Sequence, residues 1–292
     1  MTHGTENRDD TARKAFTDAT RDLVRAGFTQ EDARRSAQTL LAFSLEKVGL
    51  QLLLDFDRLI SPAEKSRYQD AVRRLASHEP MAYITRWQDF GYLEIQVAPG
   101  VLIPRTDTLI LVEAALSRLD KDRETRVLEL GCGSGAVMTA LLSARPQAQG
   151  LAIDVDPLAL EVTQANLARL GLADRARLEQ GSWFEKISAE EKFDLIVSNP
   201  PYLTTKEMAN VDESVKKEPA MALWGGCDGL DAYRAILPPA YGALREGAWC
   251  LVEIGWKQGS AVKGMFDSLG YAHTEIHQDA GARDRVVAGC RT

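Results

Sequence analysis

Residues 129–136 read ELGCGSGA, and this stretch lies between a run of apolar strand formers and a helical pattern. Its alternating glycines, Gly131, Gly133 and Gly135, permit a tight turn and let a ligand approach the backbone closely. A turn of this kind between a strand and a helix is typical of nucleotide-binding α/β folds. The stretch therefore predicts an α/β domain with a ligand site at this turn.

The surrounding chain extends the pattern in both directions. Apolar runs at 127–130, 150–153, 193–198 and 249–254 predict buried strands, and residues 136–144, 157–170 and 232–244 predict the helices between them. This alternation predicts a doubly wound, parallel sheet with helices on both faces. Residues 272–276 and 285–290 predict two more strands joined by a polar loop, which fits an antiparallel pair at the sheet edge.

The glycine turn is compatible with two ligands. Gly131, Gly133 and Ala136 satisfy the dinucleotide pattern, and Asp154 follows at a spacing suited to a ribose, so an NAD enzyme fits this segment. S-adenosylmethionine lacks a pyrophosphate and needs a close backbone surface, with an acid at the end of the second strand for the ribose hydroxyls. Asp154 supplies that acid, and Glu129 suits a cationic methionine amino group.

Residues 197–202 read VSNPPY and end the strand at 193–198 with a rigid corner. Proline cannot continue a central strand, and the carboxyl end of the strand lies at the ligand-binding edge of such a sheet. The two prolines let Asn199 and the carbonyl of Pro200 face one NH2 group, while Tyr202 covers its flat face. Two acceptors on an amide nitrogen orient its lone pair toward a sulfonium methyl. Because a hydride-transfer enzyme has no evident use for this corner, we favour S-adenosylmethionine.

The first third of the chain is helical in pattern. Apolar residues recur at spacings of three and four from Ala33 to Val48, and residues 61–64 read SPAE, a capping box with proline at the first helical position. The following helix is expected to turn Tyr68, Val72 and Leu75 inward. Alternation over 91–97, a Pro-Gly turn and an apolar return at 101–103 then predict a hairpin.

Composition narrows the class of protein. The 292-residue chain has a formal net charge of -7, which argues against a nucleic-acid-binding protein. Its four cysteines form no CxxC pair, and its four histidines form no HExxH motif, so we expect a reduced, cytoplasmic protein without a metal site. The polar N-terminus and the lack of a ~20-residue apolar stretch predict neither a signal peptide nor a membrane span.

With these motifs in place, the chain resembles the HemK/PrmC-type release-factor glutamine N5-methyltransferases. The resemblance rests on ELGCGSG and NPPY together with the segments EPMAYIT at 79–85, LIPRTDT at 102–108, EP at 218–219, DGL at 228–230 and DRV at 284–286. It implies a class I methyltransferase fold: a doubly wound, mostly parallel sheet with an antiparallel C-terminal edge strand. It also implies a helical substrate-recognition domain over 13–80, a hairpin linker over 81–104 and an S-adenosylmethionine-binding domain over 105–292, and the residues before them predict a disordered tail over 1–12.

The family methylates the glutamine of the GGQ motif in class I peptide release factors, so the resemblance implies that activity, that cofactor and that partner. Carried over by position, the cofactor-binding residues are Glu129, Gly131, Gly133, Gly135, Asp154, Ser182, Trp183 and Asn199. Asn199, Pro200 and Tyr202 are the expected catalytic residues, and Asn199, Pro200, Pro201, Tyr202 and Arg105 the expected substrate-binding residues. Trp183 is alternatively a core aromatic, and Arg105 alternatively forms an inter-domain salt bridge.

Three positions depart from the family pattern. Arg86 stands where Gly is usual, Leu109 where Glu is usual, and Ser182 where Asp is usual. Arg86 and Leu109 fall in or near the linker and bear on how a protein substrate docks, and Ser182 bears on the adenine contact. A ribosomal-protein glutamine, an exocyclic amine of RNA or DNA, and a non-enzymatic binding role therefore remain the alternatives.

Overall fold

The structure is a computed structural model that describes residues 11–47, 51 and 56–292. The chain divides into two compact units, Met1–Arg86 and Trp87–Thr292. The tail expected over 1–12 lies outside the described residues except at its end, where α1 begins at Ala12 with Thr11 as its N-cap. Val48, expected on a helix face, also lies outside them.

The first unit contains four described helices: α1 (Ala12–Arg25), α2 (Gln30–Leu45), α4 (Pro62–Ala76) and α5 (Met81–Thr85). The predicted capping box is confirmed, since the Ser61 side chain accepts from the Glu64 backbone N–H and the Glu64 side chain accepts from the Ser61 backbone N–H. Tyr68, Val72 and Leu75 are buried as predicted. The Tyr68 hydroxyl donates to the carbonyl of Ala37 at 3.0 Å, which ties α4 to α2.

The expected hairpin is present with different strands. β1 (Trp87–Phe90) pairs antiparallel with β2 (Leu93–Gln96), and Gly91, at φ +62°, turns the chain between them. The expected return strand at 101–103 is wrong, and residues 81–85 form α5. The apolar side chains of Val101 and Ile103 are buried without forming a strand. The Ile103 N–H donates to the Glu218 carboxylate at 3.0 Å instead of to a neighbouring strand.

The second unit is built on a seven-stranded sheet of order β5-β4-β3-β6-β7-β9-β8. Neighbouring strands run parallel from β5 to β7, and β9 runs antiparallel to both β7 and β8, so the predicted fold class is confirmed. The strands are β3 (Thr125–Leu130), β4 (Ala148–Asp154), β5 (Ala176–Gln180), β6 (Phe193–Ser198), β7 (Leu244–Glu253), β8 (Ala272–Gln278) and β9 (Asp284–Cys290).

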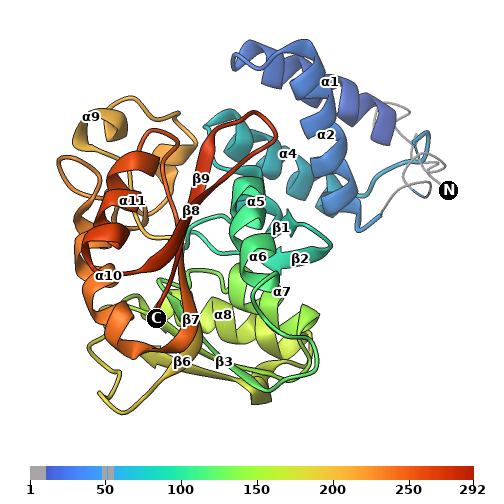
Figure 1. Cartoon of the computed structure of the whole chain (residues 1–292). Coiled ribbons are helices and arrows are strands. Elements are labelled where there is room, and N and C mark those ends of the chain that lie inside the picture. The colour runs from blue at the N-terminus through green and yellow to red at the C-terminus, as the bar shows by residue number, and fades with distance from the viewer. Residues whose placement is uncertain (1–10, 48–50, 52–55) are drawn as a thin grey trace, which may run out of the picture. The chain divides into compact units, whose positions relative to one another are not determined.

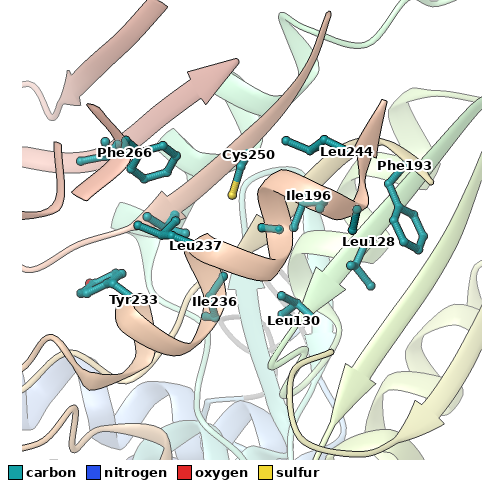
Figure 2. Packing of buried hydrophobic residues seen from close by; sticks show 14 of the residues in the cluster. Leu128, Leu130, Phe193, Ile196, Tyr233, Ile236, Leu237, Leu244, Cys250 and Phe266 are labelled. Atoms are coloured by element: carbon teal, nitrogen blue, oxygen red, sulfur yellow. The ribbon is translucent and has the colours of Figure 1, made fainter. Parts of the chain in front are cut away.

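Helices cover both faces of this sheet, with α6, α7 and α8 on one face and α10 and α11 on the other (Figure 1). Their bounds, with the short α9, are α6 (Leu109–Leu116), α7 (Ala136–Ala144), α8 (Pro157–Arg169), α9 (Thr205–Met208), α10 (Asp231–Ala243) and α11 (Gly259–Ser268). Figure 2 shows how Ile236 and Leu237 of α10 pack near Leu128 and Ile196 of the central strands. Burial of each such side chain contributes about 1.5–3 kcal/mol, which stabilises the packing of α10 on the sheet.

Candidate active site

A cavity opens at the carboxyl ends of the central parallel strands, where the sequence predicted a ligand site. Gly131 and Gly133 follow β3, Asp154 ends β4, and Asn199 follows β6. The remaining lining residues are Gly100, Val101, Leu102, Ile153, Val155, Asp156, Ala159, Gly181, Trp183, Pro201, Pro219, Met221 and Ala222. Six segments distant in sequence thus meet at this edge of the sheet.

The glycine turn is held by hydrogen bonds to the neighbouring strand. The N–H groups of Gly131 and Cys132 both donate to the carbonyl of Ile153, at 2.8 and 3.2 Å. Gly131, Gly133 and Gly135 have φ values of +70°, +55° and +72°, which L side chains rarely adopt. The turn is therefore a preformed backbone surface on one wall of the cavity.

Gly135 is the position where a side chain would disrupt this turn most. A Cβ atom there would lie 2.6 Å from Thr163 Cγ2, whereas at Gly133 it would meet no described atom within 4 Å. We expect Gly135→Ala to lower the free energy of unfolding by about 2–4 kcal/mol, from backbone strain plus overpacking, and Gly133→Ala by only about 1 kcal/mol. Urea denaturation without ligand measures both variants, and equal losses would show that the contact with Thr163 is relieved at no cost.

Asp154 connects the turn to the second strand. Its Oδ2 accepts from the Gly133 N–H at 2.8 Å, and its Oδ1 accepts from the Asp156 N–H at 3.0 Å. Burial raises the pKa of this carboxyl, while the two backbone bonds lower it. The carboxyl is thus anchored at the cavity wall, with lone pairs left for the hydroxyls of a ligand.

Glu129 lies behind the turn rather than in the cavity lining. It is buried in β3, where it accepts from the Met138 N–H at 2.9 Å, and burial raises its pKa to about 8. Gly135 and Ser182 likewise fall outside the lining residues, and the Ser182 N–H donates to Glu185 at 3.3 Å. Trp183 does line the cavity, and it adopts φ +46°.

The corner after β6 separates this cavity from a second one. Ser198, the last residue of β6, donates its hydroxyl to the carbonyl of Leu130 at 2.7 Å and holds β6 against β3. The Asn199 side-chain amide follows and donates to Thr108 Oγ1 at 3.2 Å. The second cavity is lined by Leu102, Arg105, Asn199, Tyr202, Leu203, Asn210, Val211, Asp212, Val215, Ala222 and Leu223. Asn199 therefore borders both cavities.

Arg105 and Tyr202 both line the second cavity, and each has partners elsewhere in the second unit. Arg105 is ion-paired with the buried carboxylate of Glu218, a pair within the second unit and not between the units. Burial raises the pKa of Tyr202 to about 12, and its carbonyl accepts from the Gln258 amide at 3.0 Å. Pro200 is in neither lining, whereas Pro201 faces the first cavity.

Sequence reasoning missed several residues of this site. Glu218 and Thr108 stood only as members of matched segments, yet Glu218 binds both Arg105 and the Ile103 backbone and Thr108 binds Asn199. Pro219 and Met221 line the first cavity; Pro219 stood only as a member of the matched EP pair, and Met221 was not singled out.

Comparison with known proteins places the chain in a family. A model described as the PrmC N-terminal domain matches residues 14–85, and one described as the methyltransferase small domain matches residues 109–223. A protein of Moorella thermoacetica named release factor glutamine methyltransferase is 40% identical over 96% of this chain and 99% of its own length. The chain belongs to the release factor glutamine methyltransferase family.

Other matches agree with this membership. A release factor glutamine methyltransferase of Geobacter sulfurreducens is 41% identical over 89% of this chain and 90% of its own length. A solved methyltransferase of Pyrococcus furiosus shares the fold, with a TM-score of 0.51 at 20% identity, and the match covers 68% of this chain and 89% of the other. The chain is therefore a methyltransferase that uses an S-adenosylmethionine-type cofactor, and the NAD alternative is excluded.

Two further observations concern the described part of this methyltransferase. None of its described helices is long and apolar enough to cross a membrane. No group of three or more His, Cys, Asp or Glu side chains that could hold a metal ion occurs among residues 11–47, 51 and 56–292.

The departures from the family pattern have a visible structural setting. Arg86 ends α5 with φ +70°, a backbone conformation that favours glycine, the residue usual at this position in the resemblance. Leu109 begins α6, and its Cδ2 would lie 3.2 Å from a Cβ placed on Gly91 in the hairpin turn. The Leu109 side chain thus lies close to the hairpin turn.

Proposed function

We propose that this chain transfers a methyl group from S-adenosylmethionine to the side-chain amide nitrogen of the glutamine in the GGQ motif of class I peptide release factors. The observation that carries the proposal is the place of Asn199, which borders both the cavity at the glycine turn and the cavity beside Tyr202. A methyl donor in the first cavity and an amide in the second would meet at this residue. The names of the relatives support a release factor as the substrate.

The first cavity suits the donor. Asp154 offers carboxylate lone pairs to ribose hydroxyls, Gly131 and Gly133 offer a backbone surface to the methionine part, and Trp183 offers an aromatic face. Glu129, behind the turn, places a titratable carboxyl near the cationic amino group, and Gly135 and Ser182 shape the turn and the segment before Trp183. When bound, S-adenosylmethionine supplies an electrophilic methyl group on a sulfonium centre.

The corner after β6 suits the acceptor. Asn199 Oδ1 and the Pro200 carbonyl accept the two N–H bonds of the glutamine amide, which turns its lone pair toward the first cavity. Tyr202 and Pro201 hold the flat amide, and Arg105, paired with Glu218, bounds the cavity that admits it. Because burial raises its pKa to about 12, the Tyr202 phenol stays neutral and is not a general base. On transfer the nitrogen would form its bond to the methyl carbon as the carbon–sulfur bond breaks, S-adenosylhomocysteine would leave, and the nitrogen would then lose one proton to solvent.

The two units have separate roles in this proposal. The helical residues 13–80 recognise the protein substrate, residues 81–104 form the linker that contains the β1–β2 hairpin, and residues 105–292 bind the cofactor. Because the proposed substrate is a peptide release factor, we place the reaction in the cytoplasm. The proposed reaction needs no metal, membrane or nucleic acid.

The test uses the full chain, S-adenosylmethionine and a class I release factor. Peptide mass spectrometry is expected to find one added methyl group on the GGQ glutamine, and none in a factor in which that glutamine is replaced by alanine. The same reaction is run with ribosomal proteins and with RNA. Transfer to either of these, with an unmodified release factor, would contradict the proposal and support the corresponding alternative.

A further inference from the structure

A buried polar pair, Thr108 and Glu253, lies beside Asn199. Thr108 is the last residue of the short 3-10 helix Thr106–Thr108, and Glu253 is the last residue of β7, which pairs with β6 next to Asn199. Thr108 is 3% exposed and Glu253 2% exposed. Topology thus brings residues 108, 199 and 253 together at one strand end.

The hydrogen bonds of this pair have a direction. The Asn199 amide donates to Thr108 Oγ1 at 3.2 Å. The Thr108 hydroxyl also lies close enough to the Glu253 carboxyl to hydrogen-bond its charged form. Glu253 Oε2 has no partner of its own among the residues that the structure describes, so this buried carboxylate needs a donor.

A hydroxyl has one proton, and a carboxylate can only accept. When the Thr108 hydroxyl donates its hydrogen bond to the Glu253 carboxylate, Thr108 Oγ1 can only accept from Asn199, so the side of Asn199 that faces it must be the NH2 group. Asn199 Oδ1 then faces the opposite way, toward the cavities. The reversed amide would present NH2 to the substrate NH2 and would repel it.

We propose that Thr108 and Glu253 are positioning residues that select the amide orientation of Asn199, so that its oxygen faces the nitrogen to be methylated. This inference rests on the proposed role of Asn199 in methyl transfer. It assigns a purpose to a buried carboxylate that packing alone does not explain, since a buried charge without full pairing destabilises a fold.

The surroundings of Glu253 place its pKa close to neutral, so a small fall in pH protonates the carboxylate. Burial raises its pKa to about 7, and Asp107 raises it too, whereas Arg285 and Arg105 lower it. Tyr202 also faces this carboxyl. A protonated Glu253 can donate to Thr108 and free the hydroxyl proton to point at Asn199. The wild-type kcat should therefore fall as the pH drops through about 7.

The experiment compares four variants of the full-length protein. Thr108→Val removes the hydroxyl at nearly constant volume, and Thr108→Ser restores it. Glu253→Gln replaces the acceptor by a group that can donate. Thr139→Val is the matched control, because Thr139 is a buried threonine of α7 whose hydroxyl has no hydrogen-bond partner in the described part of the chain.

Methylation of the release factor, cofactor Kd and the pH profile are measured for each variant. We expect Thr108→Val and Glu253→Gln to lower kcat about 10- to 100-fold, a loss typical of a misaligned reacting group, with cofactor Kd within about threefold of wild type. Thr108→Ser should recover most of the rate, Thr139→Val should match wild type, and Glu253→Gln should lose the fall in rate below pH ~7. A Thr108→Val enzyme within twofold of wild type, or one whose cofactor affinity falls as much as its rate, would overturn the inference.

A second readout needs no substrate. In nitrogen-15 NMR the Asn199 side-chain NH2, assigned by its loss in Asn199→Asp, should be protected from solvent exchange in wild type and unprotected in Thr108→Val. If wild type transfers no methyl to a release factor yet shows this difference, the proposed substrate fails and the positioning stands. Equal exchange in both proteins would refute the positioning whatever the substrate.

Discussion

Asn199→Ala is expected to lower kcat for release-factor methylation about 100- to 1000-fold, the range typical of removing one preorganised hydrogen-bonding group from a reacting centre. The Asn199 side chain borders both cavities, so its loss removes the acceptor that orients the amide without emptying the donor site. The substitution also removes the hydrogen bond to Thr108 but leaves Asp154 and the glycine turn untouched. Cofactor Kd, measured by isothermal titration calorimetry, should therefore change by less than about threefold.

Asn199→Asp is the matched variant for this prediction. It keeps the volume and an acceptor oxygen but removes the NH2 that Thr108 binds, and it brings a negative charge next to Glu253. We expect it to be nearly as slow as the alanine variant. If Asn199→Ala lost cofactor affinity and rate by the same factor, Asn199 would be a support of the donor cavity and not the group that holds the glutamine.

Asp154→Ala is expected to raise cofactor Kd by about 10- to 100-fold, because hydrogen bonds to a charged group contribute about 1.5–3 kcal/mol. Two effects add here: the ribose loses its acceptor, and the N–H groups of Gly133 and Asp156 lose theirs. The measurement is calorimetric titration with S-adenosylmethionine and with S-adenosylhomocysteine. At saturating cofactor, kcat should recover much further than it does for Asn199→Ala.

Asp174→Asn is the control for Asp154, since it removes one carboxylate charge at an exposed position outside the cavity. Its Kd should equal that of wild type. Unchanged affinity in Asp154→Ala would contradict the assignment of this carboxyl to the ribose and would leave it only a structural role in the turn.

Local chemistry made much of the second unit predictable. The glycine turn, the strands on either side of it and the corner at Asn199 all follow from residues adjacent in the chain, and each lies at the predicted sheet edge. The capping box at Ser61 and Glu64 is equally local and is also confirmed. The catalytic and binding roles assigned to this site remain predictions that the variants above test.

The errors arose where local signals are ambiguous. Residues 101–103 are apolar enough for a strand, but they are buried as irregular chain next to Glu218, 115 positions away from Ile103. β5 was not predicted because it lies at the end of the sheet and none of its residues is fully buried. β7 begins at Leu244, five residues before the apolar run that predicted it, and its early part was missed because residues 245–247 are exposed and not apolar.

Sequence patterns alone were enough to place most strands and helices of the second unit and to predict a ligand site at the glycine turn and an amide acceptor after β6. Periodicity, turn chemistry and proline act within a few residues, so the linear order contains them. Only the tertiary structure decided that Asn199 borders two cavities, that Arg105 is paired with Glu218, and that Thr108 and Glu253 lie behind Asn199. Those contacts join residues 91 to 145 positions apart, and they exist only because the parallel strands end at a common edge.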